Sequence, residues 1–156
     1  MDSGMKKVRT LELMAEHEKV ISRLYQEYAR KFPKYQDFWS KLASEEIEHA
    51  RWISRLHAQV KDGLLHFNEG RFKEAAIKTS LEYVKSKITE AEKENISAKK
   101  ALSVARDLEN GLIEKKYFEI FASDCREIKQ VFLDLAAATR KHYHRIEEVW
   151  INEIKN

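Results

Sequence analysis

One stretch of the chain decides its fold: Phe38–Ala50, which reads FWSKLASEEIEHA. Leu42 and Ile53 bracket two polar residues, Glu46 and His49, within an apolar pattern of helical spacing. Residues three positions apart are neighbours on a helix, so this carboxylate and this imidazole share one face. The stretch therefore predicts a helix that directs ligand-type atoms into the protein interior.

The sequence on both sides of this stretch also predicts helices. Its 156 residues include only four Gly and one Pro, which leaves few breaks. Apolar residues recur every three or four positions in the expected helices, which are Met5–Lys31, Lys34–Lys61, Lys73–Glu94, Ala98–Ala122 and Asp124–Ile154. Ser97 is the expected cap of the fourth helix and Asp124 that of the last, and a loop is expected at Gly63–Phe72. We predict an all-α four-helix bundle with one long crossover, residues 62–97, that carries an additional helix.

Composition limits where such a protein acts. A chain of this length fits one domain, residues 1–156. The 29 Lys and Arg and 26 Asp and Glu are interspersed, so we expect no nucleic-acid partner. The longest apolar run, Leu135–Ala138, is too short for a membrane span. A single Cys125 and the lack of a signal peptide favour the cytoplasm.

Acidic residues and a histidine also occupy expected core positions in the other long segments. Glu18 lies in the apolar stripe of the first, Glu109 in that of the fourth, and His142 in that of the last. Buried carboxylates would repel one another unless cations compensate them, and carboxylate with imidazole suits iron, manganese or zinc. The predicted metal ligands are Glu18, Glu46, His49, Glu109 and His142.

These residues carry a family resemblance. Glu18 with Tyr25 seven residues later, the Phe32-Pro33 stop and Phe38–Ala50 resemble the first helix pair of the rubrerythrin branch of the ferritin-like superfamily. Ala105-Arg106-Asp107-Leu108-Glu109 and His142-Tyr143-His144-Arg145-Ile146-Glu147 resemble its second pair. The resemblance implies a ferritin-like fold and a carboxylate-bridged di-iron site, with Glu46 and Glu109 as bridges. It also implies a catalytic position for Tyr25 beside the metals, although Tyr25 equally fits a packed core residue.

The function implied by this resemblance is the reduction of peroxide or dioxygen by a metal-binding oxidoreductase. The four-Cys iron centre of classical rubrerythrin cannot form here, because the chain has Cys125 alone, so an external electron donor is expected. A homodimer is expected by analogy.

Two departures from the family pattern leave alternatives open. Thr139 stands where the family has a second ligand Glu, and Leu112 where it often has another. A dinuclear site completed by water, a single-metal site and a relic without metal all fit the sequence. The rival function is a non-catalytic helical module for binding or assembly, and a lower option is iron storage in a large cage.

The remaining histidines are expected to lie away from the metals. His17 is predicted to face solvent, because it lies off the apolar stripe that contains Glu18. His144 is predicted at the surface, because it is two residues from His142.

Overall fold

The computed structural model describes the backbone of residues 2–63, 74–115 and 126–155, and the side chains of residues 9–63, 74–112 and 126–155. These residues form α-helices and one short 3₁₀ helix, with no strand among them. The elements are α1 (Asp2–Lys31), η1 (Pro33–Tyr35), α2 (Gln36–Lys61), α3 (Glu74–Lys93), α4 (Ala98–Lys115) and α5 (Arg126–Lys155). The predicted all-α class is confirmed. The expected loop Gly63–Phe72 beyond residue 63, the end of the fourth helix near Ala122 and the Asp124 cap lie outside the described residues.

Local chemistry explains where these helices end. Phe32, which precedes a proline, adopts φ −120° and ψ 83°, outside the helical region, and so separates α1 from η1. Gly63 has a φ of 77°, a left-handed conformation that glycine adopts without strain, just after α2. The Ser97 hydroxyl accepts a hydrogen bond from the Lys100 amide at 3.0 Å, which confirms the predicted cap of α4.

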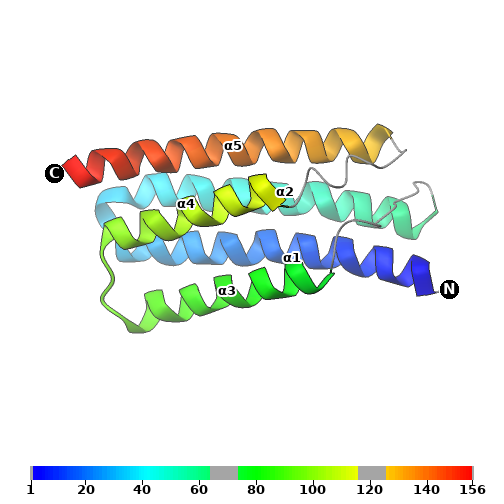
Figure 1. Ribbon diagram of the computed structural model, residues 1–156, viewed down its shortest axis with the longest axis horizontal. Helices are drawn as coiled ribbons and strands as arrows, with labels where there is room; N and C mark the ends of the chain where they lie inside the picture. The colour runs from blue at the N-terminus through cyan, green and yellow to red at the C-terminus, as the bar shows by residue number, and fades with distance from the viewer. Residues whose placement is uncertain (1, 64–73, 116–125, 156) are drawn as a thin grey trace.

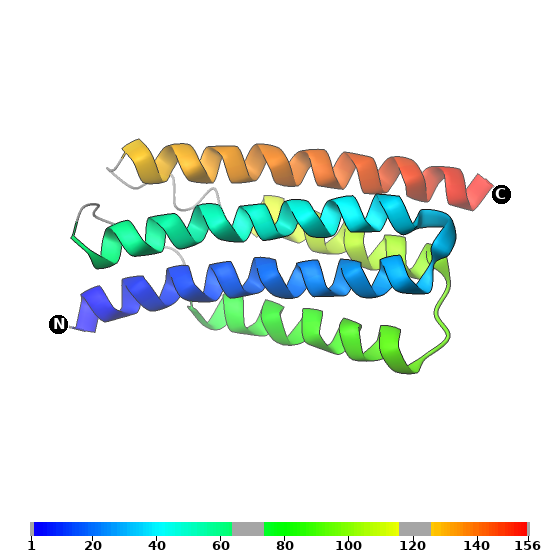
Figure 2. The same ribbon diagram turned by 180° about the vertical axis from the view of Figure 1, so that it is seen from behind.

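The helices lie lengthwise against one another (Figure 1). α1 and α2 are antiparallel neighbours, and α4 and α5 form a second antiparallel pair. α3 runs along the outer side of α1 in the same direction, and so returns the chain to the end where α4 begins (Figure 2). As a result α2 and α4 run in one direction, and α1 and α5 in the other. α3 lies within the predicted crossover segment, 62–97.

The core follows the apolar stripes of all five helices. α3 packs on α1 through a stripe of buried residues that includes Leu81 and Val84, and α5 faces inward through residues that include Phe132 and Leu135. The buried stripes are interrupted at mid-length by acidic and imidazole side chains. Within the described part of the chain, no helix is both long and apolar enough to cross a bilayer.

The core of α5 provides a test of this packing. Ile128→Ala removes a side chain that is 0% exposed and should lower the free energy of unfolding by about 2–5 kcal/mol, because a cavity remains. The matched substitution Ile151→Ala, at a side chain on the same helix that is 38% exposed, should change it by less than about 0.5 kcal/mol. Urea denaturation measures both, and equal losses would contradict this arrangement of α5.

Candidate metal centre

Four helices contribute the five predicted ligands, and the structure brings all five together. Glu18 comes from α1, Glu46 and His49 from α2, Glu109 from α4 and His142 from α5. Every one of these side chains is buried. The contacts described below link them into one continuous group, hereafter the carboxylate–histidine cluster.

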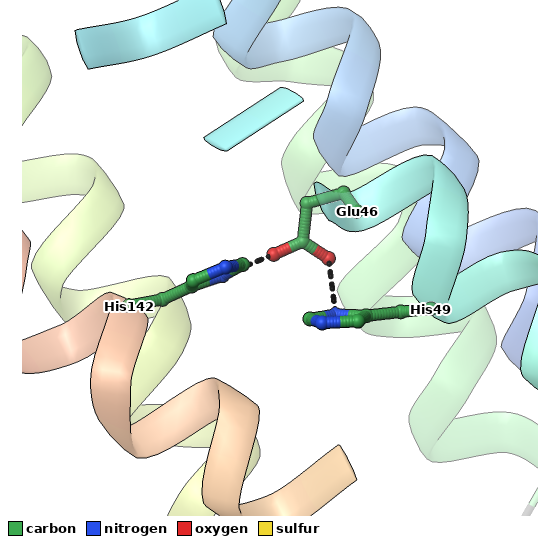
Figure 3. Close-up of side chains that lie close together, drawn as sticks. All are labelled: Glu46, His49 and His142. Atoms are coloured by element: carbon green, nitrogen blue, oxygen red, sulfur yellow. Dashed lines mark hydrogen bonds and ion pairs between the residues drawn. The ribbon is translucent and has the colours of Figure 1, made fainter. Parts of the chain in front are cut away.

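The centre of the cluster is a triad of Glu46, His49 and His142 (Figure 3). One ligand atom from each lies within 4.8 Å of the others. His142 Nδ1 is 2.8 Å from Glu46 Oε1, and His49 Nδ1 is 3.5 Å from Glu46 Oε2. The two imidazole rings are stacked, with centroids 5.1 Å apart. A carboxylate between two imidazoles is a donor set that suits iron, manganese or zinc.

Carboxyl groups adjoin the triad from α1 and α4. Glu18 lies close enough to Glu46 to lower the pKa of that carboxyl. Glu109 Oε1 lies 3.5 Å from His142 Nδ1 and accepts a hydrogen bond of 2.7 Å from the Tyr25 hydroxyl. Tyr25 is therefore both a buried core residue and a hydrogen-bond donor to a predicted ligand carboxylate. Its catalytic role stays a prediction.

Two residues next to the cluster were not identified from the sequence. Glu45 Oε1 lies 2.8 Å from His142 Nε2 and accepts a hydrogen bond of 2.6 Å from Arg145 Nη1. A carboxylate on the second nitrogen fixes the orientation and tautomer of a metal-binding histidine. Glu45 and Arg145 are partly exposed, so their helical register gives no sign of a role. The signal that could have identified them is their position in the sequence, since Glu45 adjoins Glu46 and Arg145 lies one helical turn beyond His142.

Hydrogen bonds and charge balance decide the ionisation of the cluster. Burial opposes ionisation of Glu46, but its contacts with Glu18, His142 and His49 hold its pKa well below the usual range. Burial also opposes the charge of His142, yet its contacts with Glu109 and Glu46 raise its pKa to about 11. Burial and the charge of Glu46 raise the pKa of Glu109 to about 7. An imidazolium at His142 thus balances the charge of Glu46.

The residues present fit a divalent cation. His49 Nδ1 and Glu109 Oε2 are buried and make no hydrogen bond, which is costly for polar atoms inside a protein. A cation bound by the Glu46–His49–His142 triad would satisfy His49 Nδ1 and would replace the His142 proton as the balancing charge. The donor set therefore suits metal better than it suits an ordinary core.

The structure describes both positions at which the sequence departs from the rubrerythrin-like pattern, Thr139 and Leu112. The Thr139 hydroxyl donates to the Leu135 carbonyl of its own helix at 2.8 Å, and Leu112 is a buried core residue. Asp134 is exposed and accepts a hydrogen bond from Gln130. None of these positions adds a carboxylate to the cluster.

One histidine prediction is wrong and one is confirmed. His17 is 3% exposed, and its Nε2 lies 2.7 Å from the Ser80 hydroxyl oxygen, so it does not face solvent. The reason is α3, which covers this face of α1. His144 is exposed, as predicted.

The metal-free protein should lose stability as the pH rises from about 7 toward 11. The folded pKa of His142, about 11, is above its ordinary value of 6.5, so its stabilising contribution is present below 6.5 and is lost as the pH rises through the folded pKa. The raised pKa of Glu109 also makes stability fall with pH, but this fall is complete near its folded pKa of about 7. Above that pH, His142 therefore accounts for most of the loss of stability.

Urea midpoints at about pH 7 and about pH 10 measure this effect. His142→Asn should flatten the pH dependence, whereas His144→Asn, at an exposed imidazole on the same helix, should retain it. A slope that survives His142→Asn would contradict the assignment.

Comparisons with protein-family models, with curated proteins and with solved structures found no match to this chain. What the cluster can do chemically is therefore inferred from its donor atoms, their burial and their charges. Among the described residues, the group of acidic, histidine or cysteine side chains placed to hold a metal ion is Glu46, His49 and His142.

Proposed function

We propose that this chain is a metal-binding oxidoreductase domain of the rubrerythrin-like, ferritin-like kind, which reduces peroxide or dioxygen at a di-iron centre with electrons from an external donor. The observation that carries the proposal is the buried Glu46–His49–His142 triad, flanked by the carboxyl groups of Glu18 and Glu109. A triad alone can hold one ion. The two flanking carboxyl groups support the dinuclear form.

The residues of the cluster have distinct roles in this proposal. Glu46, which contacts both histidines and Glu18, would be the central ligand. Glu109 approaches from the opposite helix pair, and Tyr25 fixes its position through the hydrogen bond at 2.7 Å. When bound, iron would supply electrons and Lewis acidity. Manganese and zinc fit the same donors.

The chain also shields the reaction from solvent. The five predicted ligands are at most 4% exposed, and Tyr25, Leu42 and Ile53, which are 0% exposed, belong to helices that carry them, so the cluster lies in the buried interior. Such surroundings strengthen interactions between the ligands and bound cations. Glu45, which contacts His142 Nε2, is partly exposed, so the contacts of the cluster extend to a side chain that reaches solvent.

A non-catalytic helical module is the second candidate, and one observation favours it. The His142 imidazolium already balances Glu46 without any metal, and Glu45 holds its other nitrogen. The buried charges can therefore be balanced, and the fold maintained, without a bound metal. In that case the helices would serve binding or assembly, whether as the homodimer expected by analogy or as a larger oligomer.

Anaerobic loading with ferrous iron, followed by elemental analysis and thermal melting, separates these candidates. We expect iron to stay bound after desalting and to stabilise the fold by about 2.7 kcal/mol when free iron is a hundred times its Kd. Addition of peroxide should then produce a new near-ultraviolet charge-transfer band. Substoichiometric metal, unchanged melting with iron, manganese and zinc, and no band would instead support the module.

A matched pair of substitutions on α2 locates the bound metal. Glu46→Gln should abolish the iron-induced rise in melting temperature, because it removes the central ligand. Glu48→Gln, at a side chain that is 42% exposed, should leave that rise unchanged. An unchanged rise in Glu46→Gln would place the metal elsewhere. Gel filtration of the unmodified protein tests the cage option.

A further inference from the structure

Three oxidisable aromatic rings lie one after another in space between the carboxylate–histidine cluster and the side of the molecule covered by α3. Tyr25, which donates to Glu109, has its ring centroid 5.4 Å from that of Trp39, and Trp39 lies 4.9 Å from Tyr28. All three side chains are 0% exposed. Rings at these separations are in direct contact, so electrons can pass from one to the next.

The outer end of this series lies toward α3. The Tyr28 phenol is affected electrostatically by Glu90 and Tyr83, which both belong to α3. Tyr83 is 41% exposed. The series therefore begins at a cluster carboxylate and ends beneath a helix that carries an oxidisable side chain at the surface.

We propose that Tyr25, Trp39 and Tyr28 form a one-electron path between the carboxylate–histidine cluster and the side of the molecule covered by α3. Its use in the cell rests on the proposed function, which requires electrons from outside the chain. The path would provide an internal connection in a chain that has no cysteine-bound iron centre.

Each ring differs in how it can handle its proton. An oxidised Tyr25 can pass its phenolic proton to Glu109 Oε1, the atom that already accepts its hydrogen bond. Trp39 Nε1 is buried without a hydrogen bond, so an oxidised indole keeps its proton and carries the charge only transiently. The Tyr28 hydroxyl and Glu90 Oε1 are both buried without a hydrogen bond, and the charge of Glu90 acts on the Tyr28 phenol, so we take Glu90 as the proposed acceptor for the Tyr28 proton.

The complete step is balanced when an external one-electron oxidant withdraws an electron from Tyr28. Trp39 then gives an electron to the Tyr28 radical, which takes its proton back from Glu90. Tyr25 in turn gives an electron to the oxidised Trp39. The net change is one electron moved from Tyr25 to the oxidant and one proton moved from the Tyr25 hydroxyl to Glu109. The resulting Tyr25 radical is buried and should persist. Electrons from a donor would follow the same rings inward.

Flash oxidation of the metal-free protein tests the path. The oxidant is photogenerated tris(bipyridine)ruthenium(III), with persulfate as the sacrificial acceptor, and the readout is the tyrosyl radical in electron paramagnetic resonance of frozen samples. We expect a long-lived signal in the unmodified protein that is lost in Tyr25→Phe. Absence of this signal in the unmodified protein would overturn the proposal.

Two matched pairs of variants test the intermediate rings. Tyr28→Phe removes only an unpartnered hydroxyl and so should preserve packing, yet the Tyr25 signal should fall to background. Tyr143→Phe, on α5, should keep it. Trp39→Phe should lose the signal, whereas Trp52→Phe, beside His49 but outside the series, should keep it. An undiminished signal in folded Tyr28→Phe or Trp39→Phe would overturn the path.

This experiment separates the path from the proposed function. It uses no metal, so a protein that fails to bind iron can still show the radical at Tyr25. If both proposals hold, Tyr28→Phe should load iron normally and should lose the Tyr25 radical. Normal iron loading with no radical in the unmodified protein would reject the path and retain the metal centre.

Discussion

The structure depends on burying carboxyl groups from three helices, Glu18, Glu46 and Glu109, in one layer of the core. Ionised groups in such surroundings are tolerated only when they are paired and hydrogen-bonded. His142 meets this need by contacting Glu46 and Glu109 together, with its pKa raised to about 11. The same geometry that balances charge in the metal-free protein places the donor atoms where a divalent cation would replace the imidazolium proton.

The direction of the helices makes this meeting possible. α3 returns the chain along α1, so α4 begins at the same end as α2 and runs parallel to it (Figure 1). The mid-length residues of the second helix pair, Glu109 and His142, therefore face the mid-length of the first. α3 has a second effect, because it covers the outer face of α1 and encloses His17 and the outer end of the aromatic series.

The cluster has two different surroundings. On one side Tyr25 joins Glu109 to buried aromatic rings. On the other side Glu45 and Arg145, both partly exposed, continue the hydrogen bonds from His142 toward the surface. The cluster thus joins a buried aromatic side chain to side chains that reach the surface.

The sequence by itself determined the helices, their breaks at Pro33 and Ser97, and the inward register of Glu18, Glu46, His49, Glu109 and His142, because these follow from local dihedral preferences and helical periodicity. It could not place His17, whose surroundings belong to a helix more than 60 residues away, or Glu45, which lies off the apolar stripe. Only the tertiary structure decided those contacts and the aromatic series, because they join side chains across helices whose mutual packing no local pattern encodes.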